Sequence, residues 1–385
     1  MPGTEGTALL DRFVPDMPPR FFQKIVSGKH GASFPVFLAP MVDQSERAFR
    51  LLCRRYGVDL CYTPMINSKM FVQSKKYRLQ NFDFQECEQD RPLIVQFSGH
   101  DSTVLLEAAK VVEPFCEAVD LNFGCPQKIA KKGNYGAYLL EDADRICKLV
   151  DVLSSKLKVP VTAKIRLPLD RPEAPEVARR LENAGCSLLA VHGRDRTENK
   201  QLTRRADWEA IKMVKANVNI PVIANGGMSN YDEVQRCYLE TGCDGVMLSE
   251  GMLENPALCQ YDYSLRQQVK LSHEYLDLVE EFPPANFKQA KSHLFKFLHC
   301  HLSVYSGFRM ELSKAKGVVG HRRVVEAVEN MLEEDVGLYS DRTDSIDEKW
   351  SNAKLYYFRY RGLSVAECLQ GGDNGSSKSF FEILL

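Results

Sequence analysis

The residue best suited to chemistry is Cys125, which lies in the segment Leu121–Pro126 (Leu-Asn-Phe-Gly-Cys-Pro). Gly124 before it and Pro126 after it restrict the backbone to a tight turn. The turn follows a short apolar run, so we expect the thiol at the end of a β-strand. Two chemistries are open to it. A nucleophile needs a lowered pKa, whereas a proton donor must keep its proton until the transition state.

Lys164 and Arg166 stand two residues apart in a second apolar run, so both side chains point to the same side of a predicted strand. A buried lysine is costly unless an anion lies beside it. A reduced flavin supplies one, because negative charge collects near its N1 and O2 atoms; a salt bridge to a buried carboxylate is the alternative. Gln96 offers a donor and an acceptor to the edge of a flavin or a base. His192 could donate to the same flavin or be purely structural.

Two glycine-containing turns, Asn225–Gly227 and Ser249–Gly251, each open a predicted helix. Glycine lets backbone N–H groups approach an anion at a helix N-terminus. In a barrel, the loops after strands seven and eight often bind a phosphate. These turns therefore indicate a phosphate site, although ordinary strand-to-helix turns also use glycine.

The loop Gln127–Ala137, directly after Cys125, is basic and rich in glycine. Lys131 and Lys132 would suit a polyanionic substrate beside an active site. A solvated loop has much the same composition, so the pattern leaves both interpretations open.

Short, nearly continuous apolar runs position these residues and recur along the first two-thirds of the chain. The eight runs are Val36–Met41, Leu60–Met65, Leu93–Ser98, Ala118–Asn122, Val161–Arg166, Leu188–His192, Pro221–Asn225 and Gly245–Ser249. Such runs are typical of strands buried on both faces of a parallel sheet. We also expect helix caps where Asp43 precedes Glu46 and where Ser229 precedes Asp232. No Gly-x-Gly-x-x-Gly follows the first run, so an open dinucleotide-binding sheet has little support.

Six of these runs carry a polar residue at or near the carboxyl end. The six are Gln96, Asn122, Lys164, His192, Asn225 and Ser249. In a closed barrel the carboxyl ends of the strands meet on one face, where catalytic residues sit. We therefore predict an α/β protein: a (β/α)8 TIM barrel with its active site on that face, followed by a small helical domain.

The chain divides into four predicted parts: an N-terminal extension (1–33), a barrel (34–262), a helical domain (263–335) and a partly flexible tail (336–385). The helical domain is basic, with eight Lys or Arg between residues 286 and 325 against one acid, Glu311, or 8 − 1 = +7. These basic residues are Lys288, Lys291, Lys296, Arg309, Lys314, Lys316, Arg322 and Arg323. A basic stretch of this kind is typical of nucleic-acid binding, with a solvated helix face as the alternative.

Composition limits the class of protein. The chain has 44% hydrophobic and 26% charged residues and a formal net charge of −1, as expected for a soluble globular protein. We find no apolar run long enough to span a bilayer and no apolar signal core in the first thirty residues. The 12 cysteines form no Cys-x-x-Cys pair, so we expect neither a disulfide scaffold nor a metal site. We expect a monomer in the cytoplasm, and also in the nucleus.

Five motifs in this order resemble the tRNA-dihydrouridine synthase family. They are Ala39–Met41, Asn122-x-Gly124-Cys125-Pro126, Lys164-x-Arg166, His192–Arg194 and Asn225–Gly227. The resemblance covers residues 34–260 and extends to Arg309–Lys316, which looks like the family's tRNA-binding helical region. Tyr62–Met65, Cys125–Gln127 and Tyr135–Ala137 look most like the eukaryotic subgroup acting on the D-loop positions usually numbered 16 and 17.

The resemblance implies FMN as cofactor, NADPH or NADH as its reductant and tRNA as substrate. Cys125 would protonate C5 of uracil while hydride from flavin N5 reaches C6. The implied cofactor-binding residues are Ala39, Pro40, Met41, Gln96, Lys164, His192, Asn225, Gly226, Gly227, Ser249, Glu250 and Gly251. The implied substrate-binding residues are Asn122, Arg166, Arg194, Lys131, Lys132, Lys314, Lys316, Arg322 and Arg323.

The turn after the eighth strand differs from the family pattern. It lacks the arginine that bacterial relatives often carry, so phosphate binding would rest on backbone donors and Arg194, with Glu250 pointing away. Two other functions stay open at this point. One is a flavin oxidoreductase acting on a small molecule, which would not need the basic helical domain. The other is a non-catalytic RNA-binding relative, which would not need Cys125, Lys164 and His192 together.

Overall fold

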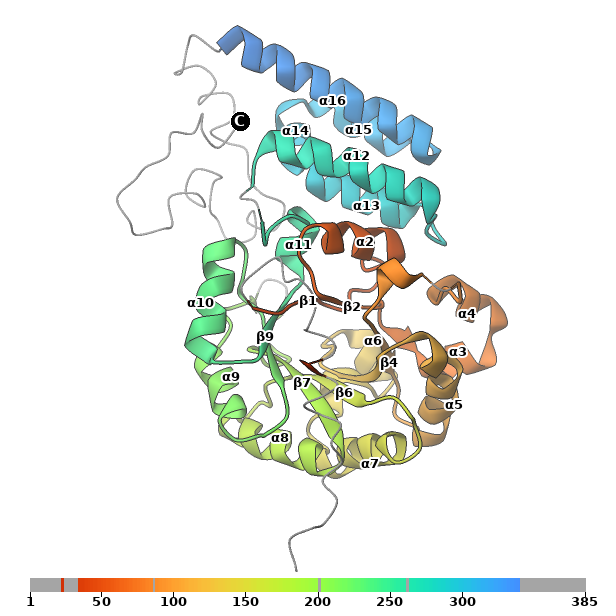
Figure 1. Ribbon diagram of the computed structural model, residues 1–385, viewed down its shortest axis with the longest axis vertical. Coiled ribbons are helices and arrows are strands. Elements are labelled where there is room, and N and C mark those ends of the chain that lie inside the picture. Colours follow the sequence, from red (N-terminus) through yellow and green to blue (C-terminus); the bar gives the residue numbers. More distant parts are fainter. Residues whose placement is uncertain (1–21, 24–33, 86, 200–201, 261–262, 340–385) are drawn as a thin grey trace, which may run out of the picture.

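A closed barrel of parallel strands forms the core of the computed structural model, which describes residues 22–23, 34–85, 87–199, 202–260 and 263–339 (Figure 1). Its strands are β1 (Val36–Leu38), β2 (Leu60–Tyr62), β4 (Leu93–Ser98), β5 (Ala118–Phe123), β6 (Val161–Arg166), β7 (Cys186–His192), β8 (Val222–Asn225) and β9 (Gly245–Leu248). β1 pairs with both β2 and β9, and β2 pairs with β4, which closes the sheet. A two-residue strand, β3 (Ile66–Asn67), pairs with the end of β4. The predicted barrel is confirmed.

All eight barrel strands coincide with the eight apolar runs of the sequence. Their side chains are buried almost throughout, because one set fills the barrel and the other packs under the surrounding helices. The interior set includes Phe37, Leu60, Tyr62, Ile94 and Met247. Phe22, close to the N-terminus, stacks on Phe37 with ring centroids 6.4 Å apart and packs against this set.

Helices surround the barrel, and several begin at a capping side chain. They are α2 (Arg47–Arg55), α3 (Ser68–Gln73), α4 (Lys75–Asn81), α5 (Ser102–Val112), α6 (Lys128–Lys132), α7 (Ala143–Ser154), α8 (Ala174–Asn183), α9 (Trp208–Lys215), α10 (Tyr231–Thr241) and α11 (Glu250–Glu254). The oxygen of Asp101 caps α5, and that of Asp142 caps α7.

Both predicted caps are wrong in detail. The cap of α10 is Asn230, one residue after Ser229; its side chain accepts from the N–H of Glu233, whose carboxylate accepts from the N–H of Ser229. Asp43 caps no helix, because it adopts a left-handed φ of 58° within the loop before α2. Glu46 stands at the N-cap of α2 without a capping hydrogen bond.

A helical region follows the barrel and lies over α2 at the top of Figure 1. It consists of α12 (Leu265–Glu281), α13 (Lys288–Phe297), α14 (His299–Val304), α15 (Ser306–Lys314) and α16 (Gly317–Tyr339). One face of α13 is buried, with Ala290, Leu294 and Phe297 fully enclosed. The tail predicted from residue 336 lies outside the described residues from 340 on, as does most of the extension predicted for 1–33. None of the described helices combines the length and apolar composition needed to cross a bilayer.

Candidate active site

Cys125 lies in the turn that follows β5, where three backbone contacts fix it. The side-chain oxygen of Asn122 accepts from the N–H of Cys125 at 2.9 Å and from that of Gly124 at 3.2 Å. The carbonyl of Cys125 accepts from the N–H of Ala137 at 3.0 Å. Gly136, with a φ of 70°, packs directly on it: a Cβ there would lie 2.6 Å from the carbonyl oxygen of Cys125. The loop after the turn therefore folds back over Cys125, and glycine is required at the point of contact.

Burial raises the pKa of the Cys125 thiol above its usual range, and the backbone N–H of Gln127 and the cations Arg166 and Lys164 only partly offset this. The thiol therefore carries its proton at neutral pH. A protonated thiol suits a proton donor and opposes a thiolate nucleophile. Of the two chemistries that the sequence leaves open, the site favours the first.

A chain of buried polar side chains leads from Asn122 into the barrel. The amide of Asn122 donates to Gln96 Oε1 at 2.8 Å, and Gln96 Nε2 donates to Asp120 Oδ2 at 2.8 Å. Thr162 donates to the other oxygen of Asp120 at 2.6 Å. Burial raises the pKa of Asp120 to about 6, although these hydrogen bonds and Lys164 favour its charged form. The sequence prediction missed Asp120, whose signal is an aspartate two residues before Asn122 in the mostly apolar β5.

Lys164 lies inside the barrel and bonds an amide instead of a carboxylate. Its Nζ donates to Asn225 Oδ1 at 3.0 Å, and Asn225 Nδ2 donates to the carbonyl of Met247 at 2.7 Å. Within the described part of the chain, Lys164 forms no salt bridge to a barrel carboxylate; Asp120 acts on it only through its charge. Burial and then the charge of Arg166 lower the pKa of Lys164 to about 8, with Asp120 opposing the shift. A further anion at this position would be stabilised by the ammonium group.

Arg166 extends from the same strand toward the Cys125 turn. Its Nε donates to the carbonyl of Gly124 and its Nη1 to that of Asp195, each at 2.9 Å. Burial and the nearby Arg194 lower its pKa to about 10. Arg166 is thus hydrogen-bonded by backbone carbonyls next to the mouth of the barrel, and the nearby carboxylates Asp195 and Glu198 offset only part of the pKa shift.

His192, at the end of β7, is neutral because burial and the charges of Arg166, Lys164 and Arg194 hold its pKa well below the usual range. Its Nε2 lies 3.2 Å from Nη1 of Arg194, so Nε2 accepts and Nδ1 carries the proton. Arg194 also donates through Nε to the carbonyl of Arg204 at 2.6 Å. The proposed donor atom of His192 is therefore Nδ1.

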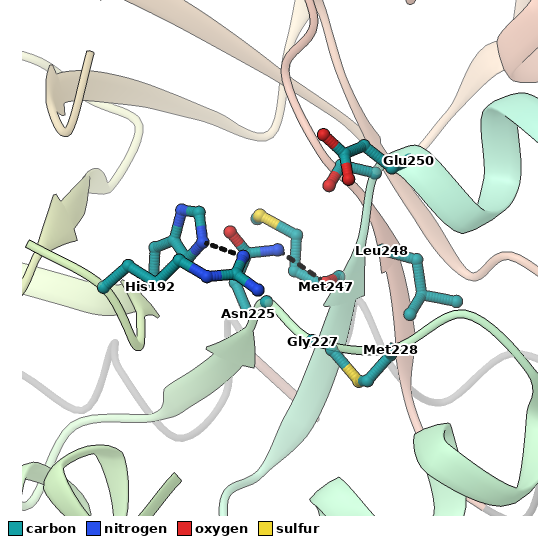
Figure 2. A pocket seen from close by; sticks show the side chains of 10 residues that line it. His192, Asn225, Gly227, Met228, Met247, Leu248 and Glu250 are labelled. Carbon is teal, nitrogen blue, oxygen red and sulfur yellow. Dashed lines mark hydrogen bonds between the residues drawn. The ribbon is translucent and has the colours of Figure 1, made fainter. Parts of the chain in front are cut away.

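A pocket lies beside these side chains at the carboxyl ends of β7, β8 and β9 (Figure 2). Its lining residues are His192, Arg194, Asn225, Gly226, Gly227, Met228, Met247, Leu248, Ser249 and Glu250. Figure 2 shows His192 and Asn225 on one side of it and Glu250 at the opposite edge. Glu250 is exposed at this edge of the pocket.

The turn between β8 and α10 is shaped for close approach of a ligand. Gly226 and Gly227 have φ angles of 105° and 84°, and a Cβ at Gly226 would lie 2.6 Å from a ring carbon of His192. Among the described residues, no side chain or carbonyl accepts a hydrogen bond from the N–H of either glycine. These donors, with Arg194 and Lys164 nearby, fit a phosphate monoester joined to an anionic ring system such as FMN.

The loop after β1 fits its predicted role less well. The N–H of Ala39 donates to the carbonyl of Leu248, Pro40 has no N–H, and the N–H of Met41 donates to Ser45 Oγ at 3.0 Å. Contacts from Ala39–Met41 to a cofactor must therefore come from carbonyls and side chains. Gly251 serves packing, since a Cβ there would lie 3.0 Å from the side chain of Leu258.

The cations predicted to bind the substrate or to form the basic stretch differ in exposure. Lys131, Lys132, Lys314, Lys316 and Arg323 are exposed. Lys296 is buried, which lowers its pKa to about 8, and cannot contact RNA. Arg322 is held by Asp277 at 2.8 Å and Glu280 at 3.4 Å, both on α12. Lys296 and Arg322 therefore add less exposed positive charge than the sequence predicts. The described residues hold no group of three or more His, Cys, Asp or Glu arranged for a metal ion.

Comparison with known proteins identifies the family. The dihydrouridine synthase (Dus) family model matches residues 37–338. The chain belongs to this family. Within the Dus family it is 44% identical over 300 residues to a tRNA-dihydrouridine(16/17) synthase-like protein of Mus musculus, covering 78% of this chain and 62% of that protein. The rat protein of the same name matches at 44%, over 78% of this chain and 68% of the relative. The Saccharomyces cerevisiae tRNA-dihydrouridine(16/17) synthase is 39% identical over 336 residues, 82% of this chain and 79% of the yeast protein.

This chain covers less than two-thirds of the length of the mouse relative. The match covers both the barrel and the helical region that follows it. All of the polar strand ends described above lie within the matched part of the chain.

Proposed function

We propose that this chain reduces uridines of tRNA to 5,6-dihydrouridine, with Cys125 as the proton donor. The observation that carries the proposal is the arrangement at the barrel mouth. A protonated, backbone-anchored thiol lies next to the buried Arg166 and the partly buried Lys164, and two glycines with φ angles favourable only for glycine line the adjacent pocket. A thiol acid and an anion site are the two elements that reduction of a uracil ring by a bound flavin requires.

FMN, once reduced by NADPH or NADH, would supply the hydride that reaches C6 of uracil. The glycine turn and Arg194 would bind its phosphate, while Lys164 and Gln96 would contact the ring system. Lys164 stabilises negative charge there, because its ammonium lies in a buried environment where electrostatic interactions are strong. His192 would donate from Nδ1.

Cys125 would donate its proton to C5 of the uracil, so that one hydride and one proton saturate the C5–C6 bond. Asn122 would hold the turn and position the base through its amide. Arg166, whose contacts are backbone carbonyls, would compensate the charge of the thiolate left after proton transfer and lie close to the RNA backbone.

The target uridine must leave its base stack to enter the barrel mouth. Lys131 and Lys132 beside the Cys125 turn, with Lys314, Lys316 and Arg323 in the helical region, would contact the phosphates of the tRNA. We infer D-loop positions 16 and 17 as targets and NAD(P)H as reductant, since the names of the mouse and yeast relatives give both.

A direct test starts from purified protein reconstituted with FMN. We expect flavin absorbance to co-purify with the protein, and mass spectrometry of nucleosides to find dihydrouridine when NADPH and tRNA lacking dihydrouridine are supplied. Protein that cannot bind FMN would overturn the proposal, as would flavin-loaded protein that oxidises NADPH but forms no dihydrouridine in any tRNA.

A further inference from the structure

The loop Met41–Glu46, between β1 and α2, is held as a rigid unit. Ser45 Oγ accepts from the N–H of Met41 at 3.0 Å and donates to the carbonyl of Met41 at 3.1 Å. The N–H of Gln44 donates to the same carbonyl at 3.1 Å. Arg50 on α2 donates to the carbonyl of Ser45 at 2.6 Å. These hydrogen bonds link the Met41 end of the loop to its Ser45 end and to α2.

One end of the loop lies at the pocket. Met41 is partly buried and packs against the cluster of side chains inside the barrel that includes Ala39 and Met247. Met247 lines the pocket and accepts, through its carbonyl, from the amide of Asn225, which in turn bonds Lys164. Met41 thus shares its packing surface with the residues placed beside the cofactor.

The other end is fastened to the helical region by a buried carboxylate. Glu46, 8% exposed, accepts from the hydroxyl of Tyr275 on α12 at 2.6 Å and lies 3.1 Å from Nε2 of His293 on α13. Tyr275 and His293 are fully buried. A weaker contact joins Gln289 Nε2 to Asp43 in the same loop at 3.2 Å. Two helices of the helical region therefore converge on one side chain of the barrel.

We propose that Glu46 is a positioning residue that couples the helical region to the barrel mouth through the Met41–Glu46 loop. The inference rests on the proposed function, because it is the cofactor and the tRNA that give each end of the loop its role. A carboxylate buried between two helices makes short, charge-assisted hydrogen bonds that fix distance and direction. RNA that contacts the helical region thereby acts on the same rigid unit that contacts the flavin site.

A second hydrogen bond between the same helices provides a matched control. Tyr56 at the end of α2 donates to Glu274 on α12 at 2.9 Å. Its replacement removes one contact between α2 and α12 but leaves Glu46 and the loop intact. Tyr275→Phe removes the equivalent contact at Glu46 and keeps the aromatic packing against Phe297.

The test measures hydrogen exchange of the peptide covering residues 41–46 in flavin-free protein, together with kcat and the KM for tRNA of loaded protein. Tyr275→Phe should raise the exchange rate of this peptide about tenfold, the effect of losing one charge-assisted hydrogen bond, and Tyr56→Phe should leave it unchanged. Tyr275→Phe should also lower kcat with little change in the KM for tRNA. Glu46→Gln, which alters both contacts, should raise the exchange rate at least as much.

Equal exchange in Tyr275→Phe and Tyr56→Phe would overturn the coupling role, as would a Tyr275→Phe variant with wild-type kcat. A wild-type protein that forms no dihydrouridine would instead overturn the proposed function. The exchange measurement does not depend on that activity, so the two failures are distinguishable.

Discussion

The side-chain oxygen of Asn122 lies 2.9 Å from the backbone nitrogen of Cys125 and accepts its hydrogen bond. Asn122 therefore belongs to the same local unit as the thiol that it helps to present. The amide nitrogen of Asn122 donates to the side-chain oxygen of Gln96, and the amide nitrogen of Gln96 donates to Asp120. These contacts fix the orientation of the side-chain amides of Asn122 and Gln96. The oxygen of Asn122 must face the backbone N–H donors of the turn, and the nitrogen of Gln96 must face the carboxylate of Asp120, which only accepts hydrogen bonds.

Replacement of Cys125 by alanine should abolish dihydrouridine formation while leaving FMN and tRNA binding intact, because the hydrogen bonds from Asn122 and Ala137 that hold the turn are made to the backbone of Cys125. The matched control is Cys147→Ala on α7, another half-buried cysteine, which should keep full activity. Nucleoside mass spectrometry and flavin absorbance measure both. Normal turnover in Cys125→Ala would exclude the thiol as the acid.

The raised pKa of Cys125 predicts slow alkylation. Because burial favours the neutral thiol, iodoacetamide should modify Cys125 more slowly than an exposed cysteine at neutral pH, with the rate rising only above the ordinary thiol value of 9.0. Tandem mass spectrometry of the peptide containing Cys125 gives the rate at each pH. Alkylation that is already maximal at pH 7 would show that the residue is a thiolate.

Gly136→Ala should both destabilise the protein and slow dihydrouridine formation. The new Cβ meets the carbonyl of Cys125 and also requires a left-handed φ of 70°, at a cost of about 1–3 kcal/mol of unfolding free energy. Gly242→Ala is the control, since Gly242 has a φ of 61° but nothing within 4 Å of its Cβ position. Denaturant unfolding should show a larger loss for Gly136→Ala, and only that variant should lose activity.

Affinity for FMN should weaken as pH rises past about 8. Burial lowers the pKa of Lys164 to about 8, so its ammonium is present below that pH and is lost above it. A bound anion would raise this pKa and move the transition upward. Flavin fluorescence titrations at several pH values measure the effect. Lys164→Met should bind FMN more weakly and without this dependence on pH; an identical pH profile in that variant would assign the titration to another group.

Reversal of Lys314, Lys316 and Arg323 to glutamate should weaken tRNA binding and reduce its dependence on salt, because each lost phosphate contact lowers the slope of log K against log salt by about one. NADPH oxidation without tRNA should not change. The control reverses Lys110, Lys148 and Lys156, exposed residues on and after α5 and α7, which gives the same change in net charge. Equal losses in the two triple variants would show that the effect is one of net charge alone.

The barrel could be predicted from sequence because its signal is local. Each buried strand is a short apolar run, and the polar residue at its end marks the face on which the strands converge. Lys164, Asn225 and His192 lie together for this reason. The exact helix caps could not be predicted, since Ser229 and Asn230 have equally suitable side chains and only the backbone conformation selects the second.

The remaining differences come from packing between distant elements. Arg322 is bound by acids on α12, and Lys296 lies on the buried face of α13, although the sequence pattern gives both as ordinary cations of a basic stretch. Asp120 acquires its partners from β4 and β6, which lie on either side of it only after the sheet has formed. Glu46 likewise meets Tyr275 and His293 across more than two hundred residues of chain.

The pairing of β1 with β9 has a consequence for the synthesis of this protein. Val36–Leu38 leaves the ribosome before all the other barrel strands, whereas its partner Val246–Leu248 emerges after the seven others. Until then one edge of β1 exposes unpaired backbone groups that could pair with another chain. Nascent chains stalled before residue 245 should therefore aggregate or bind chaperones, and release of the last strand should end that exposure.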